Sequence, residues 1–253
     1  MNKLGILITR PAGQAENLAR MIEHAGAIPI LFPTIEIQPI DERPETRAIL
    51  KQLDQYEYAI FISANAVRHG MATVRALGAW PERLAALAVG TATAQALREN
   101  GLSRILTPAE GSDSESLLRM PVLQDIQGKK LLIVRGLGGR ELLAESLRER
   151  GALVDYLECY RRGLPACDSA PILQRFAQGD IQAIAVNSAE GLENLFTLLG
   201  ERGYAYLCAS VMFVMHDRIA KRAREKGVKQ VIVTPPGDQA LAGGLIAHFE
   251  PVP

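Results

Sequence analysis

Residues 131–152, LLIVRGLGGRELLAESLRERGA, contain four aliphatic residues, a glycine-rich turn and an amphipathic helical segment in succession. A buried strand that leads directly into a helix is the building unit of a parallel sheet covered by helices. A similar stretch, ILITRPAGQAENLARMIEHAGA, occupies residues 6–27. The sequence therefore predicts an α/β fold that uses this strand–turn–helix unit more than once.

The two stretches are related by a shift of 125 positions along the chain. Between residues 7–27 and the second copy, the shift aligns nine identical residues. The same shift carries Ser63 and Ala64 onto Ser188 and Ala189, and it places Gly90 on Met215. Because one shift serves three separate units, we interpret the chain as an internal duplication.

Short apolar runs alternate with helical segments along the whole chain, which favours parallel sheets with helices on both faces. Segments rich in proline and charge, near 33–44 and 158–171, are where we expect the chain to cross between two domains. The spacing is compatible with one repeat in each domain, and equally with domains built from halves of both repeats. Ten predicted strands suit two five-stranded sheets: 4–9, 28–32, 56–62, 84–89, 104–107, 130–135, 153–158, 181–186, 207–214 and 229–234.

The composition excludes several classes of protein. Lys+Arg and Asp+Glu each number 28, and a formal net charge of zero argues against a general nucleic-acid binder. The three cysteines and four histidines lack C-x-x-C and H-x-x-x-H spacing, so no metal site is predicted. The first apolar run is too short for a signal peptide or a membrane span, so we expect a cytoplasmic, reduced protein.

The glycine-rich turn at 136–139 does not fit a nucleotide-binding motif. A dinucleotide fingerprint would have glycine where Glu141 stands, and no G-x-x-x-x-G-K-S/T motif occurs in the chain. The chain also lacks the G-x-S-x-G motif of a hydrolase elbow.

Small or hydroxyl residues follow several predicted strands, where open parallel sheets bind ligands and helix N-termini direct N–H groups outward. These residues predict an amide-rich rim that binds an anion. The alternative interpretation is that they only cap helices and form turns. The candidate binding residues are Arg10, Ser63, Ala64, Asn65, Thr91, Thr93, Arg135, Gly138, Gly139, Arg140 and Ser188.

Taken together, these segments resemble the uroporphyrinogen-III synthase family. They follow the family's order and cover the chain nearly end to end. The combination of the run R-G-x-G-G-R-E-x-L with a later Y-R-R is the feature most specific to the family. The matching pieces are ILITRPAGQ (6–14), FISANAVR (61–68), AVGTATAQAL (88–97), LLIVRGLGGRELLAESLRERGA (131–152), YRRGLP (160–165) and VNSAEGLENLF (186–196).

The resemblance implies two flavodoxin-like parallel-sheet domains joined by two crossing segments, with one domain built from both ends of the chain. The implied domains are 1–37 with 166–253, and 40–160. It further implies an enzyme that needs no cofactor. We also expect a monomer that binds neither nucleic acid nor a membrane. This enzyme would be a hydro-lyase that cyclises hydroxymethylbilane, a linear tetrapyrrole, to uroporphyrinogen III in a cleft between its domains.

In this family a tyrosine is usually proposed to protonate the leaving hydroxyl group, and Tyr160 matches it. Thr93, Ser63 and Ser188 match positions that bring hydroxyl groups to the cleft, with Asn65 beside them. Arg161 and Arg162 add positive charge near the carboxylate-rich substrate. The alternative role for Tyr160 is that of an aromatic residue packed at the crossing between domains.

The sequence departs from the family at residues 214–220, VMHDRIA, where many relatives have glycine or proline and a hydroxyl residue. His216 is a candidate substrate-binding residue that replaces a lost donor, or it is a local substitution without consequence.

Two other functions remain open at this point. A non-catalytic bilobal protein that binds a small anionic ligand in the cytoplasm would have the same architecture. A flavodoxin-like electron carrier is a weaker alternative, because the single tryptophan (Trp80) and few other aromatic residues offer little for a flavin to stack on.

Overall fold

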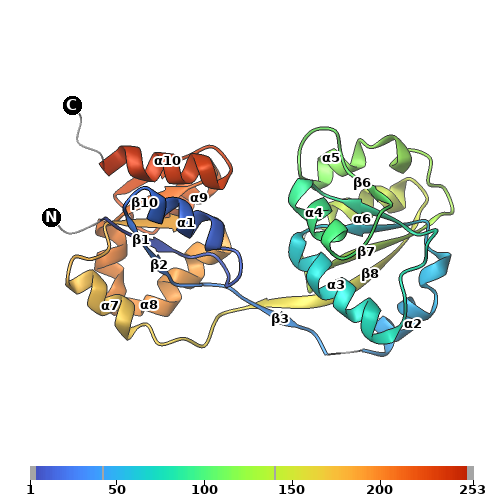
Figure 1. Ribbon diagram of the computed structural model, residues 1–253, viewed down its shortest axis with the longest axis horizontal. Helices are drawn as coiled ribbons and strands as arrows, with labels where there is room; N and C mark the ends of the chain where they lie inside the picture. The colour runs from blue at the N-terminus through green and yellow to red at the C-terminus, as the bar shows by residue number, and fades with distance from the viewer. Residues whose placement is uncertain (1–3, 42, 140, 250–253) are drawn as a thin grey trace. The chain divides into compact units, whose positions relative to one another are not determined.

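The computed structural model describes residues 4–41, 43–139 and 141–249. The chain separates into two compact units: unit 1 is Met1–Glu36 with Gly163–Pro253, and unit 2 is Ile37–Arg162. Each unit is a sheet with helices on both of its faces (Figure 1), which confirms the predicted α/β class.

Unit 1 has a five-stranded sheet in the order β11-β10-β9-β1-β2, with all neighbouring strands parallel. Helices α1 and α10 lie together against one face, and α7, α8 and α9 cover the other (Figure 1). The strands are β1 (Gly5–Ile8), β2 (Ile28–Leu31), β9 (Ala183–Val186), β10 (Val211–Val214) and β11 (Gln230–Val233). The helices are α1 (Glu16–His24), α7 (Ala170–Ala177), α8 (Ala189–Ala209), α9 (Asp217–Glu225) and α10 (Asp238–Phe249).

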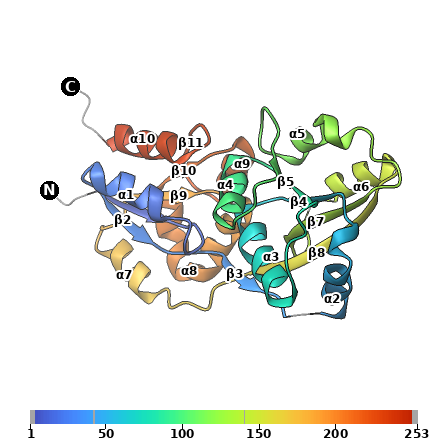
Figure 2. The same ribbon diagram turned by 45° about the vertical axis from the view of Figure 1, so that its right-hand side comes forward.

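Unit 2 has a six-stranded sheet in the order β3-β8-β7-β4-β5-β6. Helices α5 and α6 pack on one face, and α3 and α4 on the other (Figure 2). The strands are β3 (Glu36–Pro39), β4 (Tyr58–Phe61), β5 (Ala85–Ala88), β6 (Ile105–Leu106), β7 (Lys130–Gly136) and β8 (Leu153–Gly163). The helices are α2 (Pro44–Lys51), α3 (Ala64–Leu77), α4 (Thr91–Glu99), α5 (Ser114–Leu118) and α6 (Leu142–Glu149), with short 3₁₀ turns at Leu53–Gln55 and Pro121–Leu123.

The apolar strands are buried on both faces, which is why they read as continuous aliphatic runs. In β1, Ile6 and Ile8 contact the core under α1 and α10, whereas Leu7 contacts the core under α7, α8 and α9. All three side chains are fully buried. Alternate residues of each strand therefore fill two separate hydrophobic cores in each unit.

The two repeats exchange halves between the units. Strand β1 of the first repeat pairs with β9 of the second in unit 1, and β4 of the first pairs with β7 of the second in unit 2. The two pairings have the same register, since Ile6 lies opposite Ala183 and the equivalent Leu131 lies opposite Tyr58. The sheet of unit 1 consequently has the 2-1-3-4-5 order of a flavodoxin. With the extra edge strand β3 set aside, the sheet of unit 2 has the same spatial order of equivalent strands, but in circular permutation, because its chain begins at the third strand, β4.

The alignment of Gly90 with Met215 is wrong by one residue. Gly90 precedes α4 as its N-cap, and the residue that precedes α9 as its N-cap is His216. An extra residue enters the second repeat in the segment that contains α8, which is interrupted by non-helical backbone at Gly200. Residues 214–220 should therefore be compared with the first repeat at a shift of 126.

Two features of the described strands depart from the prediction. Strand β3 lies in a segment predicted only as a crossing, and β8 runs beyond 158 to Gly163. Strand β8 also contains a bulge: Arg135 pairs with Glu158 but Gly136 pairs with Tyr160, so Cys159 is the extra residue. A bulge redirects the side chains that follow it.

Candidate functional site

The carboxyl ends of the strands form a rim in each unit, and ligands of flavodoxin-like sheets bind at the point of the rim where strand order reverses. In unit 2 this point lies between β7 and β4, and in unit 1 between β1 and β9. Ser63 follows β4, and Ser188 follows β9 at the equivalent position. Both rims therefore present a serine at the expected place.

Both serines cap helices. The Ser63 Oγ accepts a hydrogen bond from the Ala66 N–H at 3.0 Å, and the Ser188 Oγ accepts one from the Gly191 N–H at 2.9 Å. Capping is thus established for these two side chains. The two serines differ in one respect: Ser63 has a further partner, because its Oγ also lies 3.2 Å from the Tyr160 hydroxyl oxygen.

Tyr160 is buried within unit 2, with 1% of its surface exposed. Its ring lies 5.5 Å from the ring of His69, between centroids. Gly136 passes so close that a Cβ there would lie 2.7 Å from Tyr160 Cε2. Burial, together with the charge of Arg68, lowers the pKa of His69, so the imidazole beside the phenol is neutral at neutral pH. The ring is therefore fixed, with its hydroxyl group directed at Ser63.

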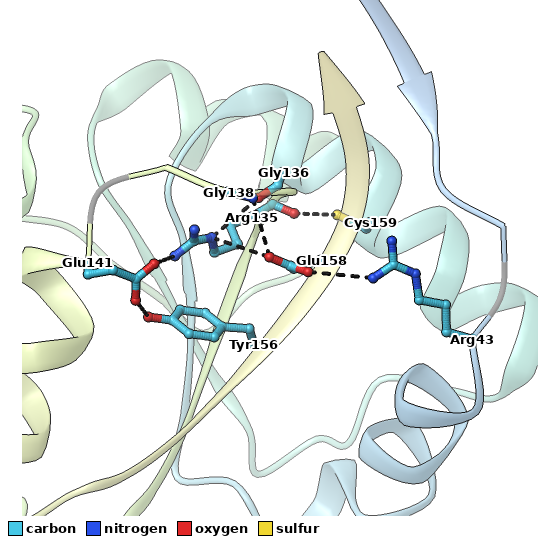
Figure 3. Close-up of polar contacts among 8 residues, drawn as sticks. All are labelled: Arg43, Arg135, Gly136, Gly138, Glu141, Tyr156, Glu158 and Cys159. Carbon is cyan, nitrogen blue, oxygen red and sulfur yellow. Dashed lines mark hydrogen bonds and ion pairs between the residues drawn. The ribbon is translucent and has the colours of Figure 1, made fainter. Parts of the chain in front are cut away.

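Arg135 is the centre of a polar cluster at the end of β7 (Figure 3). Its side chain is only 5% exposed; Nη1 lies 3.0 Å from Glu141 Oε1 and Nε 4.0 Å from Glu158 Oε1. The guanidinium also lies over the ring of Tyr156, 4.5 Å from the centroid, and the Tyr156 hydroxyl donates to Glu141. Hydrogen bonds from Tyr156 and then Arg135 hold the pKa of Glu141 below its usual range.

Glu158 joins this cluster to the glycine-rich turn. Its Oε1 accepts a hydrogen bond from the Gly138 N–H at 3.4 Å, and its Oε2 lies 3.7 Å from Arg43 Nη1 (Figure 3). Gly138 and Gly139 both have positive φ, at 72° and 115°, and both are exposed. An amide of the predicted anion-binding turn is thus already in contact with a carboxylate of the protein itself.

Unit 1 has an equivalent pair. Arg10, the repeat counterpart of Arg135, forms a 2.6 Å ion pair with Asp238 at the start of α10. Asp238 also accepts a hydrogen bond from Asn17 Nδ2 at 2.7 Å. Burial alone would raise the pKa of Asp238, but the hydrogen bonds from Arg10 and Asn17 outweigh it and lower the pKa. Neither Arg10 nor Arg135 is therefore an isolated positive charge.

The remaining predicted residues occupy two helix starts in unit 2 and one in unit 1. Ala64 and Asn65 begin α3; Thr91 and Thr93 lie in the first turn of α4, where Thr91 is exposed and Thr93 is buried. His216 is exposed before α9 and its side chain makes no capping hydrogen bond. Arg140 lies outside the described residues.

The prediction from sequence missed Glu141, Tyr156, Glu158 and Asp238, which hold the two arginines. A signal existed for part of this set, since Tyr156 and Glu158 alternate along one strand and so face the same side. Within the described ranges, no group of three or more His, Cys, Asp or Glu residues could hold a metal ion. Among the same residues, no helix has the length and apolarity to cross a membrane.

A family model and individual relatives of known function match the chain to the same family. The family model described as "Uroporphyrinogen-III synthase HemD" matches residues 16–242. The uroporphyrinogen-III synthases of Escherichia coli (strain K12) and Salmonella typhimurium (strain LT2) are 33% and 34% identical to the chain, over 93% of it and 96% of each relative.

Two solved structures of uroporphyrinogen-III synthases have a similar fold. A mutant uroporphyrinogen III synthase from the extremely thermophilic bacterium Thermus thermophilus aligns with a TM-score of 0.62 and 24% identity, over 98% of this chain and 97% of that one. The uroporphyrinogen-III synthetase from Helicobacter pylori 26695 aligns with a TM-score of 0.61 and 14% identity, over 97% and 99%. These two likenesses show the fold.

Proposed function

Because the chain belongs to the uroporphyrinogen-III synthase family, we propose that it cyclises hydroxymethylbilane to uroporphyrinogen III, with inversion of ring D and loss of water. The reaction makes it a hydro-lyase of haem biosynthesis. Within the site, the observation that best supports this reaction is the Ser63–Tyr160 hydroxyl pair, which lies where strand order reverses in unit 2. A phenol is a suitable proton source for expelling hydroxide from the terminal hydroxymethyl group.

The substrate's carboxylates require partners, and the rims supply three kinds. The starts of α3 and α8 present backbone N–H groups and partial positive charge. The turn at Gly138 and Gly139 presents amides on exposed backbone. Arg10 and Arg135 contribute guanidiniums, each with five N–H donors, so an internal carboxylate partner leaves donors for a ligand. Local groups can therefore bind an anionic ligand on a protein of zero net charge.

Much of the catalysis in this proposal is positioning. Holding the two ends of a flexible chain as a near-attack conformer removes a large part of the entropic barrier. Several binding partners along a rim fit that role, because the substrate's carboxylates are distributed along its length. The chemical step then needs one proton for the departing hydroxyl group, and cyclisation releases one proton from a pyrrole carbon.

The test uses freshly made hydroxymethylbilane and separation of the porphyrin isomers after oxidation. The proposal expects the type III isomer in excess over a control with heat-denatured protein. Formation of the spontaneous type I isomer alone, in the same amount as the control, would overturn it. That result, combined with tight binding of uroporphyrinogen in equilibrium dialysis, would instead support a non-catalytic anion-binding protein.

A further inference from the structure

The Ser63 hydroxyl lies between a buried phenol and the partly exposed rim. Its oxygen is 3.0 Å from the Ala66 nitrogen and 3.2 Å from the Tyr160 oxygen. A hydroxyl group has two acceptor lone pairs and one proton. If Ala66 N–H and Tyr160 O–H occupy both lone pairs, the proton of Ser63 remains to be donated to a third group. The 3.2 Å contact fits donation in either direction, and donation from Tyr160 to Ser63 is the one that leaves Ser63 a proton for a third group.

The burial of Tyr160 means that its proton can reach a substrate at the rim only through Ser63. Tyr160 is 1% exposed, and its ring packs in the core of unit 2 with Phe61, Val67 and Cys159. Its main-chain carbonyl accepts from the Leu137 N–H at 2.7 Å, which anchors the backbone as well. Ser63, in contrast, is partly exposed. A substrate at the rim of unit 2 would touch Ser63 before it could touch Tyr160.

We propose that Ser63 is the residue that donates the proton to the substrate's leaving hydroxyl group, and that Tyr160 acts behind it as a positioning residue and proton reserve. This inference rests on the proposed function and deepens it. As the C–O bond of the hydroxymethyl group breaks, the Ser63 proton joins the departing oxygen to form water, and the Tyr160 proton moves to the Ser63 oxygen. When cyclisation releases a proton from the pyrrole carbon, that proton passes to the Ser63 oxygen and the Ser63 proton returns to the Tyr160 phenolate, so the step consumes no external acid.

The two residues depend on each other in this scheme. An aliphatic hydroxyl is a much weaker acid than a phenol, whose ordinary pKa is about 10. Ser63 alone would have to become an alkoxide, whereas with Tyr160 the negative charge rests on a phenolate. Tyr160 alone would have its proton out of the substrate's reach. Losing either residue should therefore remove the same contribution.

The experiment is a double-mutant cycle on kcat for type III isomer formation. Ser63→Ala and Tyr160→Phe should each lower kcat by roughly 10²-fold, the usual scale of general acid catalysis, and leave KM within about threefold. The double variant should be no slower than the slower single variant, because both substitutions break one path. Kinetic effects that multiply in the double variant would overturn the relay.

Two further substitutions separate the hydroxyl group from the helix cap. Glycine is nearly as good an N-cap as serine, so Ser63→Gly should keep α3 intact yet lose as much kcat as Ser63→Ala. Ser63→Thr keeps a hydroxyl group and should retain most of the activity. A kcat near that of the wild type in Ser63→Gly would show that Tyr160 acts without Ser63 and would reject the proposal.

Ser188 provides the matched comparison, since it caps α8 as Ser63 caps α3. Ser188→Ala should lower stability about as much as Ser63→Ala, but its kinetic effect should multiply with that of Tyr160→Phe. Non-additivity of the same size in both pairs would indicate a general structural effect and would count against the relay. The wild-type isomer assay is a separate result, so failure of the proposed function is recognised independently.

Discussion

Arg10 Nη2 lies 2.6 Å from Asp238 Oδ1, across 228 positions of the chain, and joins the first strand of unit 1 to its last helix. Both side chains are largely buried, with 14% and 19% of their surface exposed. The second repeat neutralises its equivalent arginine in the same way, by Glu141 and Glu158. Each rim thus has an arginine that is held in position by carboxylates of its own unit.

The Arg10–Asp238 pair should make stability depend on acidic pH. The folded-state pKa of Asp238 is depressed, so its contribution is fully present above the ordinary carboxyl pKa of about 4 and is lost as pH falls through the depressed value. Urea unfolding between pH 7 and pH 3 should show a shallower loss of stability in Asp238→Asn than in the wild type. Arg10→Met should flatten the curve similarly, because it breaks the same pair. Parallel curves for all three proteins would contradict this account.

Arg135 should matter for stability more than a surface arginine does. Arg135→Met keeps an apolar stem over Tyr156 but leaves Glu141 and Glu158 without their shared partner. We expect a loss of about 2 kcal/mol in the free energy of unfolding, below the ~3–5 kcal/mol of a fully buried pair, because both glutamates are partly exposed. Arg148→Met is the control: Arg148 lies over the same ring but is exposed, and its loss should cost about 0.5 kcal/mol or less.

Two adjacent glycines of α10 should respond oppositely to alanine. A Cβ at Gly243 would meet open space, so Gly243→Ala should stabilise the protein by roughly 0.5–1 kcal/mol through better helix propensity. A Cβ at Gly244 would lie 2.8 Å from Thr234 Cγ2, so Gly244→Ala should destabilise it. Thermal unfolding of the two variants measures both effects. A gain in both would mean that Thr234 gives way.

The strand pattern was predictable because burial on both faces demands unbroken aliphatic runs, as at Ile6, Leu7 and Ile8. The duplication was visible because both copies keep glycine at the turn after α1 and α6, where Gly26 and Gly151 have φ of 81° and 84°. Strand β3 was missed because proline and charge dominate its segment. The extra residue of the second repeat was missed because it lies within the segment of α8, whose sequence does not mark the break in helical backbone that the structure has at Gly200.

The candidate site was predictable in position and much less so in its contacts. Ser63 and Ser188 could be placed at the rim because serine after a strand and before a helix caps that helix. The partners of Arg10 and Arg135 come from α10 and β8, and the arginine positions alone contain no information about them. Alternation along β8 would place Tyr160 on the same face as Tyr156 and Glu158. The bulge at Cys159 moves it to the opposite face, toward Ser63.

Gly136 should control activity through the position of that tyrosine. In Gly136→Ala the new methyl group would lie 2.7–2.8 Å from two ring carbons of Tyr160, so the ring must shift and lengthen its contact with Ser63. We expect kcat to fall about 10-fold or more, because a displacement of this size is costly in a positioned proton transfer. Gly70→Ala is the control: its Cβ would clash with Val134 in the same core, 2.5 Å from Cγ1, and Tyr160 is not among its three nearest neighbouring atoms. Both variants should be less stable, but only Gly136→Ala should lose kcat in the folded enzyme. Equal kcat values, measured well below each variant's unfolding temperature, would show that the position of Tyr160 does not set the rate.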